Sequence, residues 1–209
     1  MYNYNRRSRG HIGDTEPYAL EREIEDIGAL VAETGGTANL YGVSSGGALV
    51  LQAAAAGLAI DRLAVYEVPY MMGADASQRW REYVEQLEAA VAEGRRGAAV
   101  ELFMRLAGAS EQNIVRARNS SIWPGLEAIS HTLAYDAACL GDGHLPTDRF
   151  AQIRQPTLVV TGGRNDLFER AADAIAASLP QAEHERLDGQ GHVVDPEALA
   201  PLLARFLKS

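Results

Sequence analysis

The sequence contains one cysteine, Cys139, among its 209 residues. A single cysteine cannot form an internal disulfide, and it cannot supply the several thiolates of a metal–thiolate cluster. Such scarcity of cysteine is typical of proteins that work in a reducing compartment. We therefore expect a cytoplasmic protein with no metal site.

Positive charge is also scarce, because 19 lysines and arginines face 28 aspartates and glutamates, a net charge of −9. Surfaces that bind nucleic acid need clustered cations, so we do not expect nucleic acid as a partner. The one basic run, Arg6-Arg7-Ser8-Arg9, is short and is soon followed by acidic residues. Runs of this kind usually lie on a solvated surface, and we expect the same here.

Long apolar runs are missing as well. No stretch is long enough to cross a membrane, and the opening MYNYNRRSRG lacks the apolar segment of a signal peptide. We therefore expect no membrane as a partner. Apolar residues at 47% and charged residues at 22% are ordinary for a globular domain, and 209 residues can bury a sizeable core.

Three short apolar segments predict buried strands at residues 38–41, 63–68 and 157–160. Each is too short for a helix and is apolar on both alternating faces, as in parallel strands that are covered on both sides. Helical patterns separate them. The sequence therefore predicts an α/β fold in which a mostly parallel sheet carries helices on both faces.

Between the second and third predicted strands the strand patterns stop and helical patterns take over. Helices are predicted at residues 81–93, 98–106, 111–118 and 126–137. We predict that residues 1–70 and 155–209 form the α/β core. Residues 71–154 are predicted to form an inserted all-helical unit, called the helical lobe below.

The motif Gly42-Val43-Ser44-Ser45-Gly46 stands between a predicted strand and a predicted helix. It matches G-x-S-x-G, the nucleophile turn of serine hydrolases. Glycines are needed because so tight a turn strains the serine backbone and brings neighbouring residues close. The N–H groups of the following helix would face a developing oxyanion. We predict that Ser44 is a nucleophile, the alternative being a glycine-rich helix start without chemistry.

A serine nucleophile needs a base and a carboxylate that orients it. His192 lies in a glycine-rich loop where the chain returns to the carboxyl edge of the sheet, and it is the predicted base. Asp166 follows the predicted strand at residues 157–160, again at this edge, and is the predicted acid. Asp166 could instead cap the next helix. Glu67 ends a buried strand, where a carboxylate is costly without a partner, and is the alternative acid.

These features resemble the α/β-hydrolase superfamily, in particular capped, bacterial-type members of unassigned substrate. The segments that carry the resemblance are NLYGVSSGGAL, AVYEVPY, PTLVVTGGRND and DGQGHVVDPEALAPLLARFL. The resemblance implies Ser44 as nucleophile, His192 as base, Asp166 as the usual acid and the Ser45 N–H as an oxyanion donor. Some relatives place the acid after the strand that here ends at Glu67. The helical lobe occupies the position of their cap domain.

The N-terminal segment departs from the family pattern. The stretch YNYNRRSRGHIGD is similar to the family's D-x-R-G-x-G-x-S segment, with Asn5 and Ser8 in place of the aspartate and the first glycine. In the family this segment follows the fourth strand. Three strands, one helix and the loop that supplies a second oxyanion donor are therefore missing here.

The missing strands would leave residues 38–41 at an open, apolar edge of the sheet, and such an edge invites pairing. We predict that residues 2–5 pair with this strand, or that two chains pair there as a homodimer. A third alternative is that the natural chain begins further upstream.

The sequence thus predicts a serine hydrolase that cleaves an ester-like bond of a small molecule, a carboxylic ester, lactone or related acyl bond, through an acyl-enzyme. No metal or organic cofactor is required. The lobe would roof the pocket, and the candidates to line it are Trp80, Phe103, Met104, Trp123 and Tyr135. His131 and Asp136 could reach into this pocket, but we expect them to form a satisfied polar pair within the lobe. The alternative is a catalytically impaired member of the fold that binds a small molecule or a protein partner.

Overall fold

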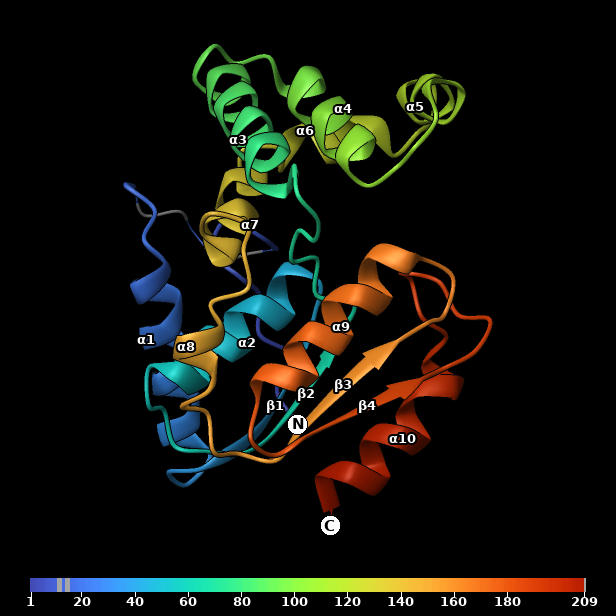
Figure 1. The fold of residues 1–209 in the computed structure, drawn as a ribbon. Helices are drawn as coiled ribbons and strands as arrows, with labels where there is room; N and C mark the ends of the chain where they lie inside the picture. Colours follow the sequence, from blue (N-terminus) through green and yellow to red (C-terminus); the bar gives the residue numbers. More distant parts are fainter. Residues whose placement is uncertain (11–12, 14–15, 209) are drawn as a thin grey trace.

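The computed structural model describes residues 1–10, 13 and 16–208 and shows one parallel sheet with strand order β1-β2-β3-β4 (Figure 1). The strands are β1 (Ala38–Val43), β2 (Ile60–Tyr66), β3 (Thr157–Thr161) and β4 (Ala182–Arg186). Each strand pairs with the next one along the chain. The predicted α/β fold with a parallel sheet is confirmed.

Helices cover both faces of this sheet. The four helices of the core are α1 (Leu20–Glu33), α2 (Ser45–Ala55), α9 (Asp166–Ser178) and α10 (Pro196–Lys208). Leu63 and Val65 of β2 pack in one apolar cluster with residues of α1, α2 and α9. Ala64 and Tyr66 point to the opposite face and pack in a second cluster with α10. This alternation explains why β2 is apolar at successive positions.

The outer edge of β1 is open in the described part of the chain. Asn39, Tyr41 and Val43 alternate toward the α10 face and are exposed, Tyr41 and Val43 to 37% each. α10 reaches only the margin of this strand, where the Asn39 Nδ2–H donates to the carbonyl of Leu207 at 3.1 Å. β1 is therefore buried on one face only, unlike the strand that the sequence predicted.

The predicted pairing of residues 2–5 with β1 is wrong, because this segment contains no strand and lies against α1. The Tyr4 hydroxyl donates to Asp26 Oδ2 of α1 at 3.2 Å. The two residues that follow the segment, Arg6 and Arg7, bind Glu23 and Asp26 of the same helix. These side-chain bonds hold the segment away from the edge of the sheet.

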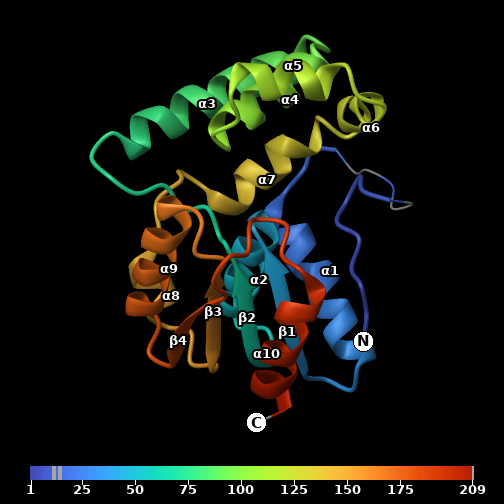
Figure 2. The ribbon, with the colours of Figure 1, turned by 90° about the vertical axis from the view of Figure 1, so that its right-hand side faces the viewer.

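Residues 67–156, all described, contain helices and no strand. The helices are α3 (Ala76–Ala92), α4 (Arg96–Leu106), α5 (Glu111–Arg118), α6 (Trp123–Ala128), α7 (Thr132–Leu140) and α8 (Thr147–Phe150). Figure 2 shows α7 lying between α3 to α6 and the core below them. Helix α7 thus connects the outer part of the helical lobe to the core.

One helix predicted at residues 126–137 is divided into α6 and α7. The Ser130 hydroxyl donates to the carbonyl of Glu127 at 2.9 Å, and the Thr132 hydroxyl donates to that of Ile129 at 2.7 Å. Hydroxyl side chains that bond to nearby carbonyls compete with the helical ladder, which explains the break.

Candidate active site

Ser44 forms the turn between β1 and α2. Its backbone has φ 56° and ψ −127°, a region that non-glycine residues rarely adopt and that costs about 1–3 kcal/mol. The strand ends at Val43 and the helix begins at Ser45, so the whole change of direction falls on this one residue. The strained serine between strand and helix is the geometry that the G-x-S-x-G motif predicted.

Two glycines allow this turn to close. A Cβ on Gly42 would lie 2.4 Å from the carbonyl oxygen of Gly46, and a Cβ on Gly47 would lie 2.6 Å from Val68 Cγ2. A side chain at Gly42 would force β1 and α2 apart, and one at Gly47 would force α2 away from the segment that follows β2. Gly46 is different, because a Cβ there would meet no atom within 4 Å. Thus the first glycine of the motif is required by packing and the second is not.

The amide groups at the start of α2 are open on one side. Gly47 and Ala48 donate their N–H groups to the Ser44 carbonyl, at 2.9 and 3.2 Å. The N–H groups of Ser45 and Gly46 make no backbone hydrogen bond with any described residue. The first N–H groups of a helix can bind an anion, so the Ser45 N–H can act as the predicted oxyanion donor.

Glu67 follows β2 directly and is the carboxylate that contacts His192. Its backbone also has a positive φ, 46°, and its side chain is only 2% exposed. Glu67 Oε1 accepts the N–H of Gly162 at 3.0 Å, and Oε2 lies 2.8 Å from His192 Nδ1. Since a carboxylate can only accept, Nδ1 carries a proton, and in the neutral imidazole Nε2 is then the proton acceptor.

Tyr66 joins the serine turn to the histidine loop. Its carbonyl accepts the Ser44 N–H at 2.8 Å, and its hydroxyl donates to the carbonyl of Gly191 at 2.6 Å. Gly191 precedes His192, and Glu67 follows Tyr66. The dipeptide at the end of β2 therefore holds Ser44 on one side and His192 on the other.

The histidine loop packs closely on the end of β3. A Cβ on Gly162 would lie 2.4 Å from the carbonyl oxygen of Gln190, so only glycine fits there. The ring of Phe168 in α9 stacks on the His192 imidazole, with centroids 4.8 Å apart and an interplanar angle of 6°. The His192 side chain is still 43% exposed. The imidazole is thus held in orientation while remaining open to an incoming molecule.

Asp166, the acid preferred from the sequence, occupies a different place. It is the first residue of α9 and is exposed to solvent. The N-cap of this helix is Asn165, whose side-chain oxygen accepts the Leu167 N–H at 2.9 Å. The geometry disagrees with the preference for Asp166 as the acid. Asp166 is already the first residue of α9, and the helix directs its side chain into solvent. The alternative, Glu67, is the carboxylate at His192.

The lobe residues proposed to line a pocket lie apart from this group. Trp80 is buried and donates its indole N–H to the Gly141 carbonyl at 2.9 Å. In α4, Phe103 is exposed and Met104 is half-buried. Trp123 lines an open groove of about 780 Å³ within the lobe. Tyr135 lines another open groove, of about 460 Å³, between the lobe and residues 16–18. Neither lining includes Ser44, Glu67 or His192, so the pocket role of these residues stays a prediction.

The basic run is not a solvated surface, which corrects the expectation for Arg6. Its side chain is 10% exposed and forms ion pairs with Glu23 at 2.5 Å and with Asp136 at 2.6 Å. Burial by itself lowers the pKa of Arg6, but the hydrogen bond with Glu23 raises it above its ordinary value. Arg6 is therefore a charged group at the junction of the N-terminal segment, α1 and α7.

Asp136 of α7 connects the lobe with the serine turn, a contact that the sequence did not reveal. Asp136 Oδ1 accepts the Ser45 hydroxyl at 2.7 Å, and Oδ2 accepts Arg9 Nη2 at 2.6 Å. Arg9 also binds the Thr132 hydroxyl. The clustering of arginines in the N-terminal segment and the acidic residue in HTLAYD were the only signals, and nothing in the sequence pairs them.

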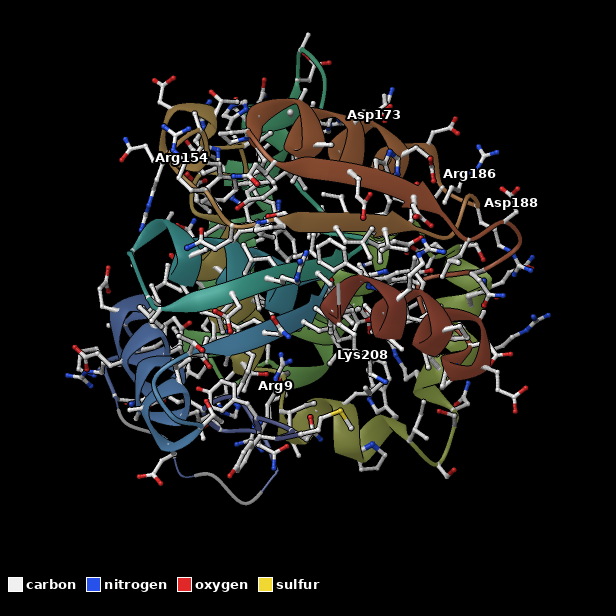
Figure 3. The ribbon with its side chains drawn as sticks, turned by 90° about the horizontal axis from the view of Figure 1, so that it is seen from below. Arg9, Arg154, Asp173, Arg186, Asp188 and Lys208 are labelled. Atoms are coloured by element: carbon white, nitrogen blue, oxygen red, sulfur yellow. The ribbon has the colours of Figure 1, made fainter. Side chains whose placement is uncertain are left out.

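A carboxylate–histidine–hydroxyl series that does not include His192 lies on the β4 side of the sheet, where Figure 3 labels Asp173. His184 Nδ1 lies 3.0 Å from Asp173 Oδ1, and Nε2 lies 3.0 Å from the Thr161 hydroxyl. Thr161 is fully buried, so its hydroxyl cannot meet a substrate. This series joins α9, β4 and β3.

Within the described ranges, no group of three or more His, Cys, Asp or Glu side chains could hold a metal ion. Among the helices of those same ranges, none is both long and apolar enough to span a bilayer.

Comparisons with known proteins show which chains share this fold. An α/β hydrolase from Sphaerobacter thermophilus shares 44% identity over 96% of this chain and 79% of its own, with a TM-score of 0.84. No curated protein sequence matches the chain.

More distant structures share the fold. A 2-hydroxy-6-oxo-6-phenylhexa-2,4-dienoate hydrolase from a Rhodococcus species is 19% identical over 97% of this chain and 78% of its own, with a TM-score of 0.63. A structure from Nitrososphaera gargenis, described with the carboxylesterases of that organism, is 16% identical over 94% of this chain and 74% of its own, with a TM-score of 0.63.

A family model described as "Alpha/beta hydrolase family" matches residues 2–202, nearly the whole chain. With a strained serine between β1 and α2, a histidine after β4 and this match, the chain belongs to the α/β-hydrolase family.

Proposed function

We propose that the protein is a serine hydrolase that cleaves a carboxylic ester, lactone or related acyl bond of a small molecule through an acyl-enzyme. The observation that carries the proposal is the contact of 2.8 Å between His192 Nδ1 and the buried Glu67 carboxylate. This contact lies beside the strained turn at Ser44. A nucleophile, a base and an orienting carboxylate on neighbouring strand ends are what acyl transfer to a serine requires.

In the first half of the reaction the Ser44 Oγ attacks the carbonyl carbon of the substrate. His192 Nε2 takes the hydroxyl proton, and Glu67 stabilises the imidazolium that forms. The carbonyl oxygen becomes an oxyanion, which accepts the Ser45 N–H. When the intermediate collapses, the bond to the alcohol oxygen breaks, and the imidazolium returns the proton to the leaving alcohol. The acyl group stays on Ser44.

In the second half water replaces the alcohol. His192 Nε2 takes a proton from the water as its oxygen attacks the acyl carbon. Collapse breaks the bond to Ser44 Oγ, which regains the proton from His192, and the carboxylic acid leaves. The enzyme returns to its starting state without a metal or an organic cofactor.

The choice of an ester-like bond is supported by chemistry and by the relatives. Dehalogenases of this fold use an aspartate nucleophile, whereas this chain has Ser44 at the turn. One similar structure is described with carboxylesterases, which cleave carboxylic esters, and another is named a hydrolase. We further propose that the helical lobe, residues 71–154, roofs the site, because α7 packs on α2 next to the serine turn.

The test is hydrolysis of p-nitrophenyl acetate by the purified 209-residue protein. The proposal predicts turnover by the wild type and a loss of roughly 10⁶-fold in kcat for Ser44→Ala, as expected when a triad nucleophile is removed. His184→Ala is the matched control, since this histidine also has a carboxylate partner but faces a buried threonine. Turnover that is equal in the wild type and in Ser44→Ala would contradict the proposal.

The alternative is a non-catalytic member of the fold that binds a small molecule or a partner protein. It is favoured by the open face of β1, where Tyr41 and Val43 are exposed. Ligand binding that survives Ser44→Ala, with no hydrolysis of any ester, would support this alternative.

A further inference from the structure

The side chain of Ser45 is held from two directions. Its hydroxyl donates to Asp136 Oδ1 at 2.7 Å and accepts from Arg6 Nη1 at 3.3 Å. Ser45 is also the first residue of α2, and its N–H makes no backbone hydrogen bond with the described residues. The residue that offers the oxyanion donor is thus fixed through its side chain by groups outside its own helix.

Asp136 is itself held by two arginines of the N-terminal segment. Arg6 Nη1 and Arg9 Nη2 each donate to one of its carboxylate oxygens at 2.6 Å. Arg6 also pairs with the buried Glu23, so the cluster contains two positive and two negative charges. The negative charge of Asp136 is therefore balanced next to the place where the oxyanion would form.

We propose that Asp136 is a positioning residue that holds the Ser45 N–H in place for the oxyanion, so that the position of α7 controls the rate of the chemical step. This inference rests on the proposed function, because it assigns the Ser45 N–H to an oxyanion. It goes beyond that function in linking the helical lobe to the chemistry through a single hydrogen bond.

The geometry gives the reason for such a link. Helix α7 lies between the outer helices of the lobe and the core (Figure 2), and Asp136 is its contact with the serine turn. A displacement of α7 would break the Asp136–Ser45 bond, whereas the Glu67–His192 bond contains no residue of α7. A donor that stabilises charge only in the transition state affects kcat, whereas KM is set by the ground state.

The test compares Asp136→Ala, Asp136→Asn and Ser45→Ala with the wild type in p-nitrophenyl acetate hydrolysis. Asp136→Ala and Ser45→Ala each lower kcat about tenfold or more and change KM less than about twofold, because a shifted donor misses the developing charge. The double variant is no slower than Asp136→Ala, since both changes remove the same bond. Asp136→Asn keeps an oxygen that can accept the hydrogen bond of the Ser45 hydroxyl. It therefore retains a higher kcat than Asp136→Ala.

Asp26→Ala is the matched control. Asp26 pairs with Arg7 of the same N-terminal segment at 2.7 Å, but this pair does not reach Ser45. The control loses an ion pair of similar kind and keeps the wild-type kcat. Amide hydrogen exchange of residues 47 and 48, whose N–H groups bond to the Ser44 carbonyl, gives a readout without turnover, and it speeds up in Asp136→Ala but not in Asp26→Ala.

The outcomes separate this inference from the proposed function. If the wild type hydrolyses the ester and Asp136→Ala matches Asp26→Ala in kcat and in hydrogen exchange, the inference is overturned and the proposed function stands. If the wild type does not hydrolyse the ester and Ser44 does not react with a phosphonate, the proposed function is overturned and this inference with it.

Discussion

His192 Nδ1 lies 2.8 Å from Glu67 Oε2, and the carboxylate is 2% exposed. The other oxygen of Glu67 accepts the Gly162 N–H, so the carboxylate is bound on both sides. Burying a carboxylate is costly unless it is hydrogen-bonded, and both oxygens of Glu67 are hydrogen-bonded. The buried carboxylate fixes the tautomer and the orientation of the imidazole.

Glu67→Gln tests the assignment of the acid. A glutamine keeps the size of the side chain but cannot stabilise the imidazolium, and its amide can impose the wrong tautomer on His192. We expect kcat for p-nitrophenyl acetate to fall about 10⁴-fold, as for the corresponding change in a serine protease.

Asp166→Asn is the companion variant. We expect its kcat to stay within about twofold of the wild type, because Asp166 is exposed and substitutions of exposed residues outside a site have small effects. A large loss in Asp166→Asn together with a small loss in Glu67→Gln would reverse the assignment.

The sequence nominated Ser44 and His192 and preferred Asp166 to Glu67 as the acid, whereas in the structure Glu67 contacts His192. Glu67 and Asp166 both follow strands at the carboxyl edge of the sheet, so the pattern of strands and helices treats them alike. The choice depends on the direction of each side chain. Glu67 has a positive φ that turns it toward Gly162, whereas Asp166 starts a helix and faces solvent. Neither property can be read from residue types.

Gly42→Ala tests the packing of the serine turn. The added Cβ would lie 2.4 Å from the backbone oxygen of Gly46, which cannot rotate away. We expect a loss of about 1–3 kcal/mol in the free energy of unfolding, the usual cost of overpacking, measured by urea denaturation.

The control for this variant is Gly46→Ala, the other glycine of the motif, where a Cβ meets open space. Alanine favours the helix over glycine by up to about 1 kcal/mol, so stability should be unchanged or higher. Equal destabilisation by both changes would mean that the turn differs from the one described.

Cys139 provides a test of the junction between α1 and α7. The thiol is fully buried, and burial raises its pKa to about 11, although the nearby Arg6 lowers it. At pH 8 only about one thiol in a thousand is therefore the reactive thiolate. We expect no reaction of the native protein with Ellman's reagent at pH 8, and one thiol per chain after denaturation. Rapid reaction in the native state would contradict the burial of this junction.

The N-terminal segment shows where sequence reasoning fails. Residues 2–5 were expected to pair with β1 because an apolar edge invites a strand, yet Tyr4 binds Asp26 and Arg6 binds Glu23. The run Arg6-Arg7-Ser8-Arg9 is predicted on a solvated surface because short basic runs usually lie there. Glu23 and Asp136 are 17 and 130 residues from Arg6, and only the tertiary fold brings them together.

The open edge of β1 leads to a prediction about the oligomeric state. We propose that two chains pair along this edge, where Tyr41 and Val43 are exposed. Sedimentation velocity should show a dimer that dissociates on dilution, and Tyr41→Lys should shift it toward monomer, because lysine on an edge strand opposes pairing. Glu183→Lys, on β4 at the opposite edge, should leave the dimer unchanged. A monomer at every concentration would refute the pairing.

The most direct test of the account is the reaction of the purified protein with a fluorophosphonate, read by intact mass, with Ser44→Ala beside it. A fluorophosphonate reacts with a serine only where a base activates the hydroxyl and a donor receives the oxyanion. We expect one adduct on the wild type and none on Ser44→Ala. The absence of an adduct on both, or an equal adduct on both, would contradict the assignment of Ser44 as an activated nucleophile.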